Sequence, residues 1–337
     1  MKKKLAIITG ASGQDGSYLC QFLLKKNYKV IAADRRSGRA SNWRHKYLNI
    51  EDKLIYEDFD LVDPNSILLL FKKYKVDEFY NLAAQSFVGS SFKTPISTAD
   101  STAIGVLRIL DTILNHQPKT KFYQASSSEM FGKTVTKFQN ENSKFYPRSP
   151  YGVSKVFGHH ITKNYRESYK LFACSGILFN HESPLRGEEF VTKKIVKNLV
   201  EVKKGKRKYL ELGNIYANRD WGYAEDYVKA MWLMLQQKFP RDFVICTGKE
   251  HSIKFFCEIV LQKLRFNYKW IGKGTNERAI DRRTKKIIIK INKKFYRPAE
   301  VDYLRGSFQN AKKHLKWYPE TKLNDLIDLM VKFELNQ

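Results

Sequence analysis

Short apolar runs alternate with longer stretches of helical periodicity through the first half of the chain. The apolar runs predict strands at Leu5–Thr9, Lys29–Ala33, Leu54–Phe59, Glu78–Ala83 and Lys121–Ala125. The stretches between them predict helices at Gln14–Lys26, Ser66–Lys75 and Ser101–Asn115. Strands and helices in this order are typical of a parallel sheet with helices on both faces. We therefore expect an α/β protein with a Rossmann-type, doubly wound parallel sheet.

The pattern loosens after about residue 175. Helical periodicity returns at Lys193–Lys203 and Tyr223–Gln237, but the simple alternation does not continue. We expect residues 1–175 to form an NAD(P)-binding Rossmann domain. Residues 176–337 are expected to form mainly a smaller, interleaved C-terminal lobe that binds the substrate, with segments that return to the sheet.

Charge is the unusual part of the composition. The 337 residues hold 61 Lys+Arg against 34 Asp+Glu, a net charge of +27. Basic runs at residues 203–208 and 282–286 are short, separate and unaccompanied by a nucleic-acid-binding module. We interpret them as a solvated surface rather than a nucleic-acid site, although an anionic small substrate would also favour a positive field.

Other composition features point to the cytoplasm. The four cysteines form no CxxC pair and lie in apolar stretches, as expected for buried, reduced thiols. The seven histidines show no metal-ligand spacing, so no metal site is expected. No apolar run approaches the roughly 20 residues of a membrane span, so no membrane partner is expected.

A glycine-rich turn follows the first predicted strand. Its sequence, TGASGQDG, places Gly10, Gly13 and Gly16 between that strand and the next helix, with Gln14 and Asp15 opening the helix. Glycines allow a tight turn and let the backbone approach a pyrophosphate at the helix N-terminus. The context predicts dinucleotide binding, and the GxxGxxG spacing resembles that of short-chain dehydrogenases.

The end of the second strand gives conflicting signals about the cofactor. Asp34 stands where an acidic residue hydrogen-bonds the ribose 2′-hydroxyl of NAD, whereas Arg35 and Arg36 suit the 2′-phosphate of NADP. NAD and NADP both stay open. Further along the chain, Asp60 and Leu61 are expected near the adenine, and Ala83 and Ala84 near the cofactor ribose.

Two segments carry candidate chemistry. Tyr151 and Lys155 form a YxxxK pair, one helical turn apart on the same face. A nearby ammonium group and the nicotinium charge would bring the tyrosine pKa down from about 10. The run QASSSE, residues 124–129, follows the fifth strand, at the sheet edge where α/β proteins bind ligands. Its Glu129 adds a proton-transfer group that simple oxidation does not require.

Several longer motifs extend over nearly the whole chain. They are GASGQDGSYL (10–19), YQASSSEMFG (123–132), YPRSPYGVSK (146–155), GILFNHESPLRG (176–187), RDWG (219–222), AMWLMLQQ (230–237) and RPAEVD (297–302). Together they resemble the GDP-mannose 4,6-dehydratase family of extended short-chain dehydrogenases. The resemblance runs from about residue 4 to about residue 330.

The resemblance implies a role for each matching residue. Tyr151 would take the proton from the sugar O4, and Ser127 would contact O4. Lys155 would set the pKa of Tyr151 and hold the nicotinamide ribose. Glu129 would move the C5 proton to the departing C6 hydroxyl. The product would be GDP-4-keto-6-deoxymannose plus water. The remaining residues implied to bind the GDP-sugar, through its diphosphate, ribose or sugar, are Ser86, Ser128, Asn180, Val191, Lys194, Arg219, Arg297 and Glu300.

The chain also departs from the family pattern. Ser127 replaces a usual threonine and keeps its hydroxyl, Asp34 puts the usual NADP in doubt, and Phe87 and Tyr223 replace usual histidines. Another GDP-sugar such as a GDP-heptose, or a 4-epimerase or reductase reaction on the same fold, therefore remain alternatives. The resemblance implies a homodimer or a homotetramer, with a dimer through the helices around Ser101–Asn115 and Tyr151–Tyr169.

Overall fold

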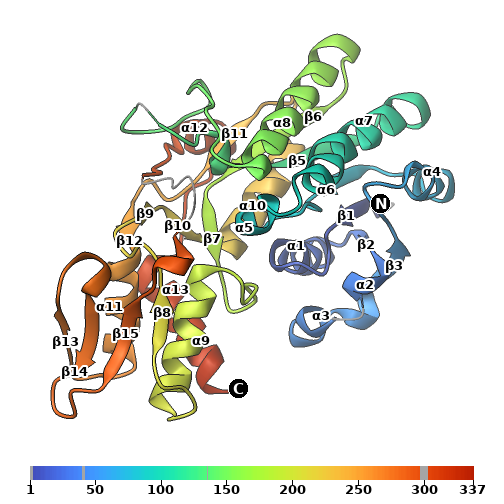
Figure 1. The fold of residues 1–337 in the computed structure, drawn as a ribbon. Helices are drawn as coiled ribbons and strands as arrows, with labels where there is room; N and C mark the ends of the chain where they lie inside the picture. Colours follow the sequence, from blue (N-terminus) through green and yellow to red (C-terminus); the bar gives the residue numbers. More distant parts are fainter. Residues whose placement is uncertain (1–2, 40–41, 135, 297–302) are drawn as a thin grey trace.

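A computed structural model describes residues 3–39, 42–134, 136–296 and 303–337 of the chain. Its centre is a seven-stranded sheet in the order β11-β6-β5-β4-β1-β2-β3 (Figure 1), in which every printed pairing is parallel. The strands are β1 (Leu5–Thr9), β2 (Lys29–Asp34), β3 (Ile55–Asp58), β4 (Glu78–Asn81), β5 (Lys121–Ser127), β6 (Ala173–Leu178) and β11 (Phe243–Ile245). The predicted Rossmann-type sheet is confirmed. The strand order reverses between β1 and β4, where such sheets bind ligands.

Helices cover both faces of this sheet. One face carries α1 (Gln14–Lys25), α10 (Ala224–Leu235) and α12 (Gln309–Leu315), and the other carries α4 (Pro64–Lys73), α7 (Gly105–His116) and α8 (Pro150–Tyr169). Successive strand residues point to opposite faces, so Ile8 packs in the core beneath α1 whereas Ile7 packs in the core beneath α7. Both faces are therefore apolar, as the short hydrophobic strands predicted.

The connections of the first half contain several short elements. They are α2 (Arg36–Arg39), α3 (Trp43–Tyr47), η1 (Glu51–Lys53), α5 (Val88–Ser91), α6 (Pro95–Ala99), η2 (Asp100–Ile104) and η3 (Ser128–Met130). One difference from the prediction concerns the helix expected at Ser101–Asn115. In the structure the helical path begins at Pro95 and passes through a π-helical turn, η2, before α7. Gly105 then packs against Leu61, where a Cβ would lie 2.9 Å from the Leu61 Cβ.

A second, smaller body holds most of the remaining chain (Figure 1). Its four-stranded sheet has the order β13-β14-β15-β8 and packs with α9, α11 and α13 around a separate apolar core. These elements are β8 (Leu210–Leu212), β13 (Tyr268–Ile271), β14 (Arg278–Asp281), β15 (Ile287–Ile291), α9 (Val191–Lys203), α11 (Ile253–Lys263) and α13 (Leu323–Leu335). Short 3-10 turns η4 (Gly274–Asn276) and η5 (Lys293–Phe295) complete it.

The two bodies are interleaved along the chain. The strand β7 (Asn180–Glu182), which lies between β6 and α9 in the chain, pairs with β10 (Trp221–Tyr223). A second small pair joins β9 (Asn218–Arg219) to β12 (His251–Ser252). After the chain has entered the smaller body, α10, β11 and α12 return to the large sheet. The fold thus brings residues beyond 176 against the carboxyl ends of the first strands.

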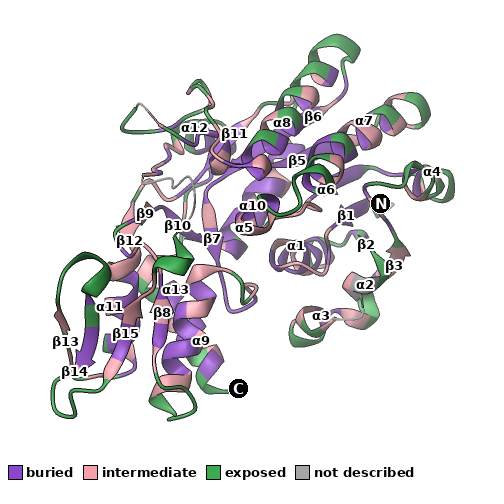
Figure 2. Cartoon of the chain, viewed as in Figure 1, coloured by how far each residue is buried: buried purple, intermediate pink, exposed green. Residues whose placement is uncertain are grey.

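The two basic runs lie at one end of the smaller body. Parallel pairing of β8 with β15 places the loop before β8 beside the turn before β15, and residues 203–208 and 282–286 are all exposed there (Figure 2). This much of the excess charge is a solvent-facing surface. All four cysteines are free and buried, as predicted. Within the described residues, no helix combines the length and apolar character that crossing a membrane requires.

Candidate active site

The glycine-rich turn between β1 and α1 has the shape of a phosphate cradle. Gly10 has a φ of +68°, and a Cβ on it would lie 2.9 Å from the Ala83 nitrogen. A Cβ on Gly16 would lie 2.2 Å from the Gly10 oxygen. Gly13 caps α1 without a side chain, which leaves the N-terminal N–H groups available to an anion. These residues fit a dinucleotide pyrophosphate, and they bring Ala83 beside the turn.

Gln14 and Asp15 turn their side chains toward the segment that follows β7. Gln14 Nε2 donates to the His181 oxygen at 3.1 Å, and Ser183 Oγ donates to Gln14 Oε1 at 2.7 Å. Asp15 Oδ2 lies 2.7 Å from His181 Nε2, while His181 Nδ1 lies 2.7 Å from the Phe179 oxygen. Both ring nitrogens of His181 therefore face acceptors, which is the arrangement of an imidazolium.

The charges of this pair are mutually stabilised. Burial alone would raise the pKa of Asp15, but the charge and hydrogen bond of His181 outweigh it and lower that pKa to about 2. Burial would likewise lower the pKa of His181, yet Asp15 raises it above its ordinary value. Sequence reasoning missed His181, although it lies in the polar NHES run that directly follows the apolar segment GILF.

The end of β2 lies next to the same turn. Asp34 Oδ2 accepts a hydrogen bond from the Ser12 nitrogen at 2.6 Å, and burial raises the pKa of Asp34 although that bond opposes the shift. Arg35 and Arg36 are exposed. Sequence reasoning also missed Arg44, whose guanidinium donates to the Ser12 oxygen at 3.0 Å and to the Leu185 oxygen at 2.7 Å.

Four other predicted cofactor residues lie in the neighbouring loops. Asp60 Oδ1 accepts from the Val62 nitrogen at 3.1 Å, and Leu61 is buried against Gly105. The Ala83 nitrogen donates to Thr9 Oγ1 at 3.2 Å, and Ala84 follows it at the same edge of the sheet. These contacts place both segments at the carboxyl edge of the sheet.

The candidate catalytic residues converge at the ends of β5 and the start of α8. Ser127 ends β5 and accepts a hydrogen bond from the Glu129 nitrogen at 3.2 Å through Oγ. Ser149 caps α8 through the Gly152 nitrogen at 3.0 Å, which fixes the first turn that carries Tyr151. A Cβ on Gly152 would lie 2.9 Å from the Glu129 oxygen. The helix and the serine-rich loop are therefore in close contact.

Lys155 lies one turn further along α8. Its Nζ donates to the Ala125 oxygen at 2.7 Å and lies 5.6 Å from the Tyr151 ring centre. Burial lowers the pKa of Lys155 to about 8. Burial also raises the pKa of Tyr151 to about 12; the hydrogen bond from Ser127 opposes this shift and the charge of Glu129 adds to it. Within the chain alone, Lys155 does not bring the tyrosine pKa down, so a further positive charge is needed for that.

Residues predicted for the sugar nucleotide come from both bodies. Asn180 is on β7 opposite Trp221 of β10, and the buried Arg219 lies two residues before Trp221. Val191 begins α9, and Lys194 in the same helix has its Nζ 3.7 Å from the Phe295 ring centre. Ser86 is exposed and Ser128 buried. Arg297 and Glu300 lie outside the described residues.

An aromatic contact links the two sides. Phe87, after β4, packs edge-on against Phe190, just before α9, with ring centres 6.1 Å apart. The Arg186 guanidinium stacks on the Phe190 ring, with its carbon 3.4 Å from the ring centre. Sequence reasoning named neither Phe190 nor Arg186. The contact shows that Ser86 and the start of α9 border one region.

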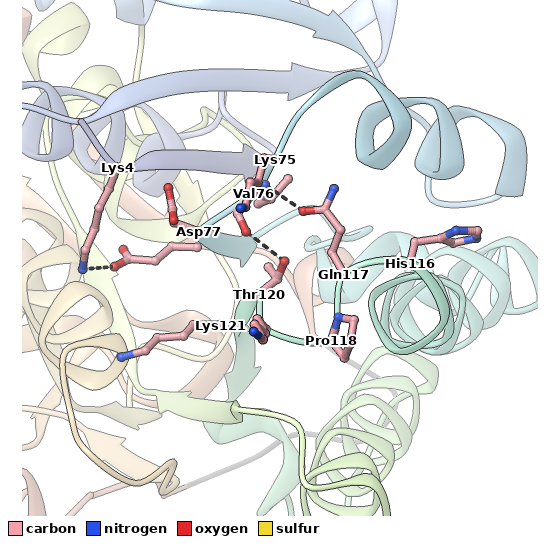
Figure 3. A pocket seen from close by; sticks show the side chains of 11 residues that line it. Lys4, Lys75, Val76, Asp77, His116, Gln117, Pro118, Thr120 and Lys121 are labelled. Atoms are coloured by element: carbon pink, nitrogen blue, oxygen red, sulfur yellow. Dashed lines mark hydrogen bonds and ion pairs between the residues drawn. The ribbon is translucent and has the colours of Figure 1, made fainter. Parts of the chain in front are cut away.

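A different hollow lies at the amino ends of the same strands. It has a volume of about 650 Å³ and is lined by residues of the loops before β4 and β5, including Lys75, Gln117 and Lys119 (Figure 3). It is at the opposite edge of the sheet from Ser127 and Tyr151, so it is separate from the candidate site. Among the described residues, no group of three or more His, Cys, Asp or Glu could hold a metal ion.

A family model described as GDP-mannose 4,6 dehydratase matches residues 7–330. The chain belongs to the GDP-mannose 4,6-dehydratase family. Relatives named GDP-mannose 4,6-dehydratase include one from Vibrio cholerae, 45% identical over 100% of this chain and 95% of the relative. A human relative of that name is 44% identical over 98% of this chain and 91% of its own length. The predicted family is thereby confirmed.

Solved structures confirm the fold of this dehydratase-family chain. A UDP-glucose 4-epimerase from Thermotoga maritima superposes with a TM-score of 0.82 at 21% identity, with 98% of each chain covered. A dTDP-glucose 4,6-dehydratase from Bacillus anthracis, in complex with NAD, gives a TM-score of 0.81 at 20% identity, with 99% and 97% covered. At these identities the likeness establishes the fold alone.

Proposed function

We propose that this chain is an NAD(P)-dependent GDP-mannose 4,6-dehydratase, a hydro-lyase that converts GDP-mannose to GDP-4-keto-6-deoxymannose and water. Relatives that carry this name match 98–100% of the chain at 42–45% identity where human, Vibrio and Sinorhizobium proteins are compared. The observation that carries the proposal is the close approach of the Glu129 loop to the first turn of α8, together with the effect of the Glu129 charge, which adds to the raised pKa of Tyr151. An epimerase or reductase needs no base at C5.

The first step is oxidation at C4 of the hexose. Tyr151 takes the proton of the O4 hydroxyl while Ser127, its neighbour, hydrogen-bonds O4. When bound, a nicotinamide cofactor supplies the hydride acceptor for C4 and later the hydride donor for C6. Its positive ring would supply the opposing charge that the high pKa of Tyr151 requires. Lys155, held by the Ala125 oxygen, adds its ammonium and binds the nicotinamide ribose.

The second step is loss of water across C5 and C6. The 4-ketone acidifies the C5 proton, which Glu129 takes and gives to the departing C6 hydroxyl. C6 then receives the hydride, and C5 receives a proton. Tyr151 removed one proton from O4 and one proton is added at C5, so the protons balance. No net oxidation occurs, so the same cofactor molecule can serve successive turnovers.

The two parts of the chain divide the binding. We assign residues 1–175 to the cofactor, with Gly10, Gly13 and Gly16 at the pyrophosphate, and residues 176–337 mainly to the GDP-sugar. Asn180, Lys194 and Arg219 are assigned to the diphosphate, because guanidinium and ammonium groups bind phosphate oxygens well. The enzyme is proposed to work in the cytoplasm.

A homodimer through α6–η2–α7 and α8 is also proposed. Ile96, Ile104, Val153 and Phe157 on these elements are large apolar side chains that are exposed. An exposed apolar patch on neighbouring helices is typical of a protein interface. Replacing Val153 by Glu should shift the protein toward the monomer in sedimentation, whereas replacing the exposed Phe239, which lies elsewhere, should not.

The direct test of the function is mass spectrometry of purified protein incubated with GDP-mannose, with NAD or NADP added separately. A nucleotide-sugar product lighter than the substrate by one water is the expected result. Unchanged GDP-mannose with folded protein and either cofactor would overturn the proposed substrate, and GDP-heptoses would be assayed next.

A further inference from the structure

The position of Asp34 carries an inference about which nicotinamide cofactor the site selects. Asp34 ends β2 at the carboxyl edge of the sheet, directly beside the glycine-rich turn. Its Oδ2 accepts the Ser12 N–H at 2.6 Å, so the carboxylate is fixed rather than free to turn toward solvent. A carboxylate at this point of a Rossmann-type sheet hydrogen-bonds the 2′-hydroxyl of an adenosine ribose.

The neighbouring cations are placed differently. Arg35 and Arg36 are exposed and would have to lose side-chain freedom to bind a 2′-phosphate. Arg44 is fixed, but its guanidinium is bound to the Ser12 and Leu185 oxygens. Its charged neighbours are Glu189, Arg186 and Asp15. The fixed charge at the end of β2 is therefore negative.

The backbone of α2 closes over the same carboxylate. A Cβ on Gly38 would lie 3.3 Å from Ser12 Oγ and 3.8 Å from both Cβ and Cγ of Asp34. A side chain at position 38 would therefore be in van der Waals contact with Asp34.

We propose that this chain selects NAD over NADP, and that Asp34 is the residue that determines this selection. The proposal rests on the proposed function only in that a nicotinamide cofactor is bound at the glycine-rich turn. A 2′-phosphate would bring two negative charges against the fixed Asp34 carboxylate, whereas a 2′-hydroxyl would donate a hydrogen bond to it.

Dissociation constants of NAD and NADP, measured by calorimetry on the full chain without sugar, test the proposal. Wild-type protein is expected to bind NAD at least tenfold more tightly than NADP, and the dinucleotide released from the denatured purified protein should be NAD. Asp34→Asn keeps an acceptor for the Ser12 N–H and removes the charge. It is expected to tighten NADP binding at least tenfold and to change NAD binding by only a few-fold.

Asp52→Asn is the matched control, because Asp52 is an exposed aspartate on η1 and its loss changes the net charge equally. It should leave the ratio of the two constants as in wild type. Equal or tighter binding of NADP by wild type, or an unchanged ratio in Asp34→Asn, would overturn the proposal. NAD selection without dehydration of GDP-mannose would support it while refuting the proposed function, and binding of neither dinucleotide would overturn both.

Discussion

The two edges of the central sheet differ in how completely their buried charged groups are paired. At the amino ends of the strands, the buried Glu78 has a partner for each part of its carboxylate. Tyr28 and Tyr80 donate to it at 3.0 and 2.8 Å, Lys4 at 3.1 Å and Gln236 at 3.1 Å. Polar groups around the neighbouring hollow also bind one another: Thr120 and Gln117 form hydrogen bonds with the Val76 backbone (Figure 3). At this edge the buried charge of Glu78 and its hydrogen-bond partners stabilise the packing of the surrounding segments.

At the carboxyl ends Asp15 and His181 are paired, but the charge of Lys155 is less well matched. Lys155 is buried with the Ala125 carbonyl as its partner, and the described residues place no carboxylate within ion-pair distance of it. Burial accordingly lowers the pKa of Lys155 to about 8 and raises that of Tyr151 to about 12. Groups with such shifted pKa values are characteristic of sites that transfer protons. The comparison predicts that changes at Tyr151 and Glu129 affect turnover, whereas a change at Glu78 affects stability alone.

The largest effect is expected from Tyr151→Phe. Loss of the phenolic hydroxyl removes the group that takes the O4 proton, so product formation should fall about 10²–10⁴-fold. Tyr165→Phe is the matched control, because Tyr165 is a buried tyrosine on the same helix whose hydroxyl lies 3.5 Å from Asp111. Turnover within a few-fold of wild type in Tyr151→Phe would break the assignment.

Glu129→Gln should separate the two halves of the reaction. The amide cannot accept the C5 proton, so dehydration should fall about 10²-fold or more, while reduction of the bound cofactor by GDP-mannose should still be seen by absorbance. Dehydration at the wild-type rate would show that another group is the base at C5. Loss of cofactor reduction as well would place Glu129 in the first step instead.

A smaller effect is expected from His181→Gln, which leaves Asp15 without its cationic partner. The free energy of unfolding should fall by about 1.5–3 kcal/mol. Asp15 has a lowered pKa of about 2 and contributes above its ordinary 3.8, whereas His181 has a raised pKa and contributes fully below its ordinary 6.5. The loss should therefore be greatest between those values, and should shrink as pH rises through the folded pKa of His181 or falls toward 2.

Denaturant unfolding of both proteins across this pH range measures the effect. His160→Gln, on the exposed side of α8, is the control and should change stability little at any pH. A pH-independent loss in His181→Gln would mean that packing against Tyr227, whose ring centre is 4.6 Å away, accounts for it rather than the charge pair.

The smallest effect belongs to the amino-terminal edge. Glu78→Gln weakens the hydrogen bonds from Tyr28, Tyr80 and Lys4, so unfolding free energy should fall by about 1 kcal/mol with turnover unchanged. Lys75→Gln, an exposed lysine of the same hollow, should change neither quantity measurably. A clear loss of turnover in Glu78→Gln would mean that the two edges are coupled.

Local pattern was sufficient for most of the first half. The strands predicted at Leu5–Thr9 and Lys121–Ala125, and the turn around Gly10, are present because hydrophobic period and glycine spacing are properties of adjacent residues. The π-helical turn at Asp100–Ile104 was not predictable, since it depends on packing rather than on propensity.

The remaining features depend on residues that are distant in sequence. β11 is only three residues long, and its place beside β6 is decided by packing. Asp15 and His181 are separated by 166 positions, so no local period connects them. The YxxxK spacing predicted that Tyr151 and Lys155 share a helix face, but the raised pKa of Tyr151 follows from burial, which the spacing does not report.

The most direct test of the whole account follows one hydrogen atom. GDP-mannose carrying deuterium at C4 is converted by the wild-type enzyme, and the product is analysed by NMR and mass spectrometry. The account predicts that the deuterium is retained and found at C6, because a single cofactor molecule carries it between the two carbons. Product with the deuterium lost to solvent, or with the label still on C4, would contradict oxidation at C4 followed by reduction at C6.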